Sequence, residues 1–148
     1  MLPKFRFFGR VSDGKMRMVS ADCIDFENGY IYYHYNNYTE EEGDHVYGDC
    51  IDLEDCVPMQ STGLFDENGQ EIFESDIVKT TIFFGRADES GGFYEYEKEL
   101  IGIVKQLEGA WVIDTEKGAV YLWSDINENE VLGNIWENPK LLEEIKDE

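Results

Sequence analysis

Two Asn-Gly pairs, Asn28-Gly29 and Asn68-Gly69, interrupt a chain of short aromatic and aliphatic segments. Because both residues tolerate a positive φ, this pair is the strongest short-range indication of a two-residue hairpin turn. The flanking segments are rich in Tyr, Phe, Ile and Val, which favour a pleated, half-buried surface. The pattern predicts a mainly β protein (a β-rich α+β fold) made of antiparallel hairpins.

Residues 1–60 are predicted to form an N-terminal β-rich region of short hairpins. Strand-like alternation and apolar runs are separated by turn residues, which is typical of small antiparallel sheets. An acidic segment, Glu40–Asp44, is expected to be a solvated loop. The expected strands cover residues 4–8, 16–19, 30–35 and 51–54.

A boundary is expected near Pro58–Thr62, followed by a C-terminal region over residues 61–148. Phe93–Glu99 alternates aromatic and charged residues from Tyr94 onward, which is typical of an exposed hairpin arm. A mobile loop is expected over residues 86–92. Further strands are predicted near residues 77–84, 100–106, 110–113, 119–122 and 130–135.

One helix is predicted, at the C-terminal end. Asn138-Pro139 fits an N-cap followed by proline at the first helical position, where a missing N–H costs nothing. Leu141, Leu142 and Ile145 then fall on one face at helical spacing.

The net charge of −21 constrains the partners of the chain. Residues 1–60 hold 12 acids and 5 bases, and residues 61–148 hold 21 acids and 7 bases, so the excess is distributed. Nucleic-acid binding needs Lys and Arg to displace counterions from phosphates, and anionic membranes repel such a protein. We therefore expect no direct nucleic-acid binding and no membrane association.

Location and thiol chemistry follow from the same sequence. The start of the chain, Met1–Arg6, has no apolar signal core, and no apolar run approaches the roughly 20 residues of a membrane span. A cytoplasmic location is expected. Cys23, Cys50 and Cys56 have no structural-zinc spacing, so buried or idle thiols are favoured over a zinc site completed by His34 or His45.

No motif predicts catalysis, a cofactor or a metal. Asp66, Asn68 and Gly69 suggest part of a calcium-binding loop, but that alignment puts Leu64 and Ser75 where carboxylates are required. A hairpin turn is the better interpretation. Neither histidine lies in a nucleophile motif and no phosphate-binding loop is present, so no site residues are assigned and the chain is not expected to be an enzyme.

The tyrosine-rich segment 30–35 has two interpretations. Aromatics on a strand can stack against single-stranded nucleic acid, but that mode also needs a cationic groove. Residues 19–78 contain no Lys or Arg. Packing in a core or an interface is the favoured interpretation.

The second half carries a sequence that resembles a known hallmark. Residues 59–78, Met-Gln-Ser-Thr-Gly-Leu-Phe-Asp-Glu-Asn-Gly-Gln-Glu-Ile-Phe-Glu-Ser-Asp-Ile-Val, are similar to the hallmark of the YopX family of phage and prophage proteins. Lys4-Phe5-Arg6 with Lys15-Met16, and Val131–Leu142, resemble the opening and closing motifs of that family. Ser75 replaces a glycine of the hallmark, which argues against a positive-φ turn there.

The resemblance implies a small SH3-like barrel in residues 61–148, with Ile101–Val104 and Trp111–Ile113 among its strands. It also implies a phage or prophage accessory protein without a characterised activity, in the cytoplasm of a host cell. Members are thought to be homo-oligomeric.

Two functions are carried forward. The first is a non-enzymatic accessory protein that contacts an unknown host or phage protein, or further copies of itself. The alternative is an acidic nucleic-acid mimic that inhibits a host DNA-binding protein or nuclease, which the distributed charge of −21 motivates.

Overall fold

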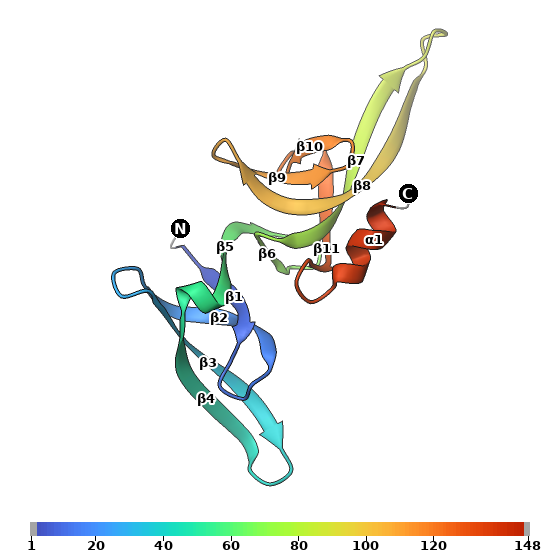
Figure 1. Cartoon of the computed structure of the whole chain (residues 1–148). Helices are drawn as coiled ribbons and strands as arrows, with labels where there is room; N and C mark the ends of the chain where they lie inside the picture. Colours follow the sequence, from blue (N-terminus) through green and yellow to red (C-terminus); the bar gives the residue numbers. More distant parts are fainter. Residues whose placement is uncertain (1–2, 147–148) are drawn as a thin grey trace. The chain divides into compact units, whose positions relative to one another are not determined.

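A computed structural model describes residues 3–146, and the chain divides into two compact units, Met1–Ser61 and Thr62–Glu148 (Figure 1). Antiparallel strands dominate both units, and α1 (Pro139–Lys146) is a short C-terminal helix. The mainly β prediction is confirmed. Within residues 3–146, no helix is both long and apolar enough to cross a bilayer.

The first unit contains a meander of long hairpins. Its strands are β1 (Phe5–Arg10), β2 (Met16–Asp25), β3 (Tyr30–Thr39), β4 (Gly43–Asp52) and the beginning of β5 (Cys56–Phe65). The sheet order is β4-β3-β2-β1-β5-β6, where β6 (Glu71–Phe73) lies beyond the junction and belongs to the second unit. The hairpins predicted before residue 50 are therefore confirmed, with longer strands than the sequence indicated.

One sequence expectation in this unit is wrong. The segment 51–54 is not one alternating strand, because β4 ends at Asp52 and a 3₁₀ turn, Leu53–Asp55, follows. The boundary expected near Pro58–Thr62 agrees with the division between Ser61 and Thr62, although β5 runs through it without interruption. The alternating pattern of residues 51–54 was too short to separate a strand from a turn.

The first Asn-Gly turn forms as predicted. Gly29 has a φ of 78°, and its N–H donates to the carbonyl oxygen of Asp25 at 2.8 Å. The Asp25 carboxylate accepts bonds from the backbone and side-chain nitrogens of Asn28, and these bonds lower the pKa of Asp25. The side chains of the turn therefore reinforce the register of β2 and β3.

A buried cluster holds the first unit together. Phe7 and Tyr33 are in edge-to-face contact, with ring centroids 5.2 Å apart. The side chains on the opposite face of β3, such as Tyr32, are exposed, as the period of two requires. The buried members are Phe7, Val11, Val19, Ile31, Tyr33 and Ile51.

The second unit is built on an open five-stranded sheet. Its strands are β7 (Asp76–Ala87), β8 (Phe93–Leu107), β9 (Ala110–Thr115), β10 (Gly118–Tyr121) and β11 (Asn127–Asn134), in the order β10-β9-β8-β7-β11. The segments 93–99 and 100–106 are one continuous strand, β8. The buried cluster contains Ile72, Val78, Val104, Ile113 and Leu122.

The SH3-like barrel is not formed. β10 and β11 lie at opposite edges of the sheet order, and no backbone ladder joins them among the described residues. A side chain of β11 instead contacts the residue that follows β10, because the Asn129 amide donates to the carbonyl oxygen of Leu122 at 2.7 Å. The second unit therefore has the antiparallel strands expected for a barrel, but its sheet does not close.

Residues of the hallmark segment, 59–78, stabilise the fold through hydrogen bonds. Asp66 is buried beside the Asn68-Gly69 turn, and its Oδ1 accepts the N–H groups of Asn68 and Gln70. Thr62 donates its hydroxyl to the carbonyl oxygen of Ile72 at 2.7 Å. These bonds hold the β5–β6 turn, so the hairpin interpretation is confirmed and the calcium-loop alignment has no support.

The expectation for Ser75 is wrong. Ser75 has a φ of 74° although it is not glycine. Its N–H donates to the carbonyl oxygen of Val104 at 2.9 Å, and its own carbonyl oxygen accepts from Ile135 at 3.1 Å. Ser75 keeps the positive-φ turn because both of its backbone groups are hydrogen-bonded, one to β8 and one to the residue that follows β11.

α1 begins at Pro139, as predicted. The side chain of Asn138 contacts a residue that precedes it in the sequence, because its Oδ1 accepts the N–H of Asn134 at 3.1 Å. Leu141 and Leu142 are half-buried, while the side chain of Ile145 lies outside the described part of the chain.

Candidate functional site

A two-stranded ribbon projects from the sheet of the second unit (Figure 1). The described pairing of β11 with β7 ends at Ile82, and that of β9 with β8 begins at Ile103. Between these points β7 and β8 pair with each other, from Ile82 opposite Lys98 to Ala87 opposite Phe93. We call residues 82–98 the arm, and the exposed hairpin predicted over 93–99 is confirmed.

The tip of the arm is a hydrogen-bonded turn. The N–H of Asp88 donates to the carbonyl oxygen of Gly92 at 2.8 Å, and Asp88 Oδ1 accepts from the backbone N–H groups of Ser90 and Gly92. The hydrogen bonds from Ser90 and Gly92 lower the pKa of Asp88. The loop expected over residues 86–92 is thus shorter, because β7 continues through Ala87.

The register separates the arm into two chemically different faces. Directly opposed residues share a face, and alternate residues along each strand point to opposite faces. The basic-aromatic face contains Ile82, Phe84, Arg86, Tyr94, Tyr96 and Lys98. The acidic face contains Phe83, Gly85, Ala87, Phe93, Glu95 and Glu97, and Glu99 extends it toward the sheet.

Rings on the basic-aromatic face pack against one another. Phe84 and Tyr96 stack with centroids 5.0 Å apart and an interplanar angle of 17°, and Tyr94 lies 6.0 Å from Tyr96. Each such pair contributes about 0.5–1.5 kcal/mol beyond its area burial. This face therefore stiffens the arm from within.

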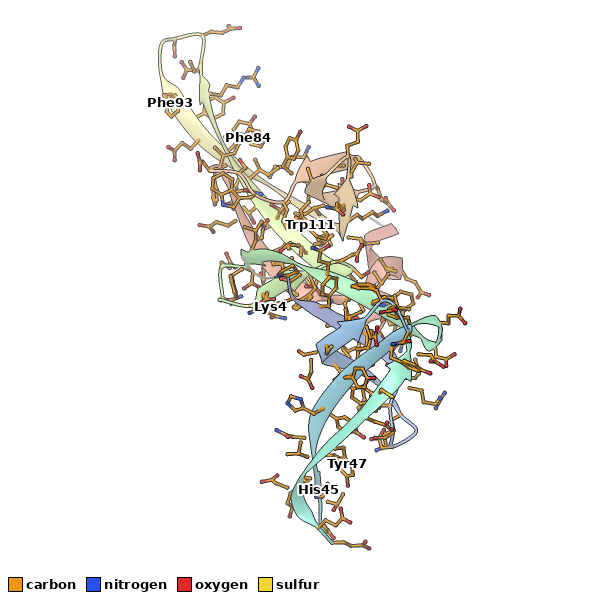
Figure 2. The ribbon with its side chains drawn as sticks, turned by 90° about the vertical axis from the view of Figure 1, so that its left-hand side faces the viewer. Lys4, His45, Tyr47, Phe84, Phe93 and Trp111 are labelled. Atoms are coloured by element: carbon orange, nitrogen blue, oxygen red, sulfur yellow. The ribbon has the colours of Figure 1, made fainter. Side chains whose placement is uncertain are left out.

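An open groove of about 510 Å³ lies on the arm, and its lining comes mostly from the acidic face, with Phe84 and Tyr96 contributed by the other face. Phe93 lies across the backbone of Gly85, where a Cβ atom would fall on the ring. The ring of Phe93 is nevertheless 69% exposed, and Figure 2 shows it on the outer part of the arm, beyond Phe84. The groove is lined by Phe83, Phe84, Gly85, Phe93, Glu95, Tyr96 and Glu97.

The carboxylates beside the groove are uncompensated. Glu95 and Glu97 form no ion pair with any residue of the described chain, and the nearby bases Arg86 and Lys98 belong to the other face. Aromatic rings beside open carboxylates can receive a group that is both apolar and cationic. Covalent chemistry would need a different set of groups.

The tyrosine-rich hairpin of the first unit is a second aromatic feature. Tyr33, Tyr35 and Tyr47 form a row of stacked rings along one face of β3 and β4, at 6.2 and 5.4 Å. His45 meets Tyr47 edge-on at 4.6 Å, near the end of the hairpin (Figure 2). The guanidinium of Arg17 lies 5.1 Å from the centroid of Tyr35.

The inner part of this row of rings packs in the core of the first unit. Its inner end, Tyr33, is buried in the core, and burial raises the pKa of its hydroxyl. The Tyr33 oxygen accepts the N–H of Ser12 at 3.1 Å. Core packing therefore holds the ring, and this hydrogen bond holds its hydroxyl group. Packing in the core is therefore a sufficient interpretation for the inner part of the tyrosine run.

The cysteines and histidines do not form a site. Cys23 and Cys50 are exposed rather than buried, while Cys56 is half-buried and burial raises the pKa of its thiol. His34 Nδ1 lies 2.6 Å from a carboxylate oxygen of Asp22 instead of packing between strands. No group of three potential metal ligands occurs within residues 3–146.

The sequence analysis did not predict that the arm has two chemically different faces. The alternation of residues 93–99 identified an exposed strand, but the faces depend on the partner strand. Phe83, Gly85 and Phe93 come together only once the register places Ala87 opposite Phe93. The signal available in the sequence was the spacing of Glu95, Glu97 and Glu99, which puts three acids on one face.

Comparison with known proteins supports the resemblance found in the sequence. The model of the family described as YopX protein matches residues 4–143. A crystal structure of protein EF1440 from Enterococcus faecalis is similar over 96% of this chain and 99% of that one, with 22% identity and a TM-score of 0.51. That similarity shows the fold alone. A comparison with curated proteins found no significant match.

Proposed function

The chain belongs to the YopX family, and on that premise we propose that it is a non-enzymatic accessory protein of a phage or prophage that acts through protein contacts made by the arm. The observation that carries this proposal is the exposure of Phe93, Tyr94 and Tyr96 on a ribbon outside the buried cluster of its unit.

Aromatic exposure of this kind is costly unless it is used. Full burial of a large apolar side chain contributes about 1.5–3 kcal/mol, and these partly exposed rings leave part of that free energy unused. Aromatic residues are enriched at protein interfaces, where they provide most of the binding energy. The core of the second unit forms from other residues, so the rings of the arm are available to a partner.

The arm is also preorganised. The Asp88 turn and the Phe84–Tyr96 stack fix the ribbon before any partner arrives. Preorganisation reduces the conformational entropy that binding would otherwise cost. A hydrogen-bonded, aromatic ribbon therefore suits recognition of a protein.

Photo-crosslinking tests the proposal in the host cytoplasm, where we place the protein. p-Benzoylphenylalanine introduced at Phe93 should give a discrete covalent adduct to another protein. The same reagent at Phe26 is the matched control, because that ring is 72% exposed but lies in the first unit. Absence of an adduct from position 93, or equal adducts from both positions, would overturn the proposal.

A further copy of the chain is a second kind of partner, and light scattering tests for it. We propose that the protein forms a homo-oligomer, with the exposed rings of the arm contributing to the contact. Purified protein at high concentration should then show a mass above that of the 17.2 kDa chain. A strict monomer at high concentration would remove this part of the proposal.

Nucleic-acid mimicry is a second candidate, which the row Glu95, Glu97 and Glu99 favours. Alternate residues of a strand are about 6.8 Å apart, so these carboxylates form a regular line of negative charge. A mimic must present such charges as phosphates do. It predicts that the protein displaces duplex DNA from a host DNA-binding protein, and failure to compete would exclude this role.

A further inference from the structure

We propose that the acidic face of the arm binds an extended, Lys- or Arg-bearing segment of a partner protein, with the aliphatic part of a basic side chain in the Phe83–Phe93 groove. This inference rests on the proposed function, because it specifies the chemistry of the partner at the same arm.

The groove favours this occupant over a purely apolar one. Its aromatic lining comes from Phe83 and Phe93, together with Phe84 and Tyr96 of the other face, while Glu95 and Glu97 line the same depression. A basic side chain can lay its methylene groups along the rings and direct its charged head to the carboxylates. A cation near an aromatic face is attracted by the negative potential of the ring.

The opposite face is the weaker candidate. Its rings already pack against one another, since Tyr96 contacts both Phe84 and Tyr94. Phe93 has no such ring partner among the described residues, and it covers backbone at Gly85. The unsatisfied apolar surface and the unpaired charge therefore coincide on the acidic face.

Spacing gives the occupant an extended conformation. The carboxylates of Glu95, Glu97 and Glu99 recur at every second residue, about 6.8 Å apart. A partner strand with bases at alternate positions has the same repeat, and opposite charges across neighbouring strands stabilise their pairing. The described pairing of β8 with β9 starts at Ile103, so the outer edge of residues 94–100 is open to such a strand.

The test uses the full chain and a defined probe. A fluorescein-labelled nine-residue peptide alternating lysine with valine is titrated and followed by fluorescence anisotropy at about 0.15 M salt, where the Debye length is about 8 Å. A peptide alternating glutamate with valine is the reference. The basic peptide should bind and the acidic one should not.

Matched variants separate the groove from bulk attraction to a chain of charge −21. Glu95→Gln with Glu97→Gln should weaken binding about fivefold to tenfold, because each exposed pair contributes up to about 1 kcal/mol. Glu40→Gln with Glu41→Gln removes the same charge from the exposed β3–β4 turn and should change binding less than about twofold. Phe93→Ala should also weaken binding, with unchanged thermal unfolding as the check on folding.

Equal losses in the two double variants would overturn the inference, because they would indicate attraction by net charge alone. So would preference for the acidic peptide, which would identify the basic-aromatic face instead. If position 93 crosslinks to a protein in cells but the basic peptide does not bind, the function of the arm stands and the partner chemistry proposed here is wrong. No crosslink from position 93 overturns the function itself.

Discussion

The carboxylate of Asp66 reaches across the second unit to Val131, where Oδ2 accepts the backbone N–H at 2.9 Å. Its other oxygen accepts the N–H groups of Asn68 and Gln70 within the hairpin turn. One buried side chain thus joins the β5–β6 turn to β11, which is 65 residues further along the chain. Both residues lie within the range 4–143 that the family model matches.

Replacing Asp66 with alanine should therefore destabilise the second unit by about 2–4 kcal/mol. A fully buried donor left without a partner costs about 1–3 kcal/mol. Three N–H groups lose their acceptor, but these hydrogen bonds are only partly buried, so the expected total is smaller than three full penalties. Trp111, Trp123 and Trp136 all lie in the second unit, so urea unfolding followed by tryptophan fluorescence measures that unit alone. Asp66→Asn should cost less than Asp66→Ala, since one oxygen acceptor remains.

The sequence predicted the elements of this region but could not predict the long-range bond. The Asn68-Gly69 turn was identified from local conformational preference, and the structure confirms it. The contact with Val131 depends on the register of β11, which shifts by a bulge between Val131 and Gly133. A bulge has no period-two signature, so only the folded sheet reveals it.

Ser75 supplies a second prediction, because it has a φ of 74° although it is not glycine. The left-handed conformation costs a residue with a Cβ about 1–2 kcal/mol. Ser75→Gly should stabilise the second unit by about 0.5–1 kcal/mol, after the larger entropy loss of glycine is included. Ser75→Val should have the opposite sign, because a branched Cβ is least tolerated there. Urea midpoints of the three proteins check this order, and a destabilised glycine variant would contradict it.

The arm illustrates a different limit of sequence reasoning. Alternation from Tyr94 onward correctly indicated exposure, because a half-buried strand would carry aliphatic residues on one face. Residues 93–99 and 100–106 were nevertheless separated, although β8 runs through both. The change from charged to aliphatic alternation marks the point where the strand enters the sheet. The hydrophobic pattern of a strand depends on which of its side chains are buried. Along β8 the burial changes at this point, while the extended backbone continues.

Asp13 gives a pH prediction for the first unit. Hydrogen bonding to the Arg17 guanidinium, with a further bond from the N–H of Lys15, lowers the pKa of Asp13. A lowered pKa in the folded state means that the stabilisation is complete above the unfolded value and is lost as pH falls through the folded one. Asp13→Asn should thus lower the melting temperature at pH 7, and the difference should shrink below about pH 4.

Near-ultraviolet circular dichroism of tyrosine measures this effect. Glu27→Gln is a suitable control, since it removes one exposed carboxylate from the same unit. Its effect on the melting temperature should be smaller at pH 7. A difference between wild type and Asp13→Asn that persists unchanged at pH 2.5 would show that the Arg17 contact does not act through the charge of Asp13.

The last prediction compares two glycines that lack room for a side chain. A Cβ on Gly102 would lie 2.5 Å from the backbone oxygen of Asp114, whereas a Cβ on Gly85 would meet the ring of Phe93. Backbone in the middle of a sheet cannot move aside, but an exposed ring can rotate. Gly102→Ala should therefore cost about 2–3 kcal/mol, as overpacking does, and Gly85→Ala less than about 1 kcal/mol.

Tryptophan fluorescence in urea measures both glycine variants, because both lie in the second unit. Gly85→Ala should still change the arm, since the Phe93 ring must leave the backbone and the groove must change shape. Peptide binding should therefore fall in Gly85→Ala while stability is nearly kept. Equal destabilisation by the two variants would mean that the Phe93 ring is as firmly held as the β8–β9 backbone, and the arm would then be part of the core rather than a surface presented to a partner.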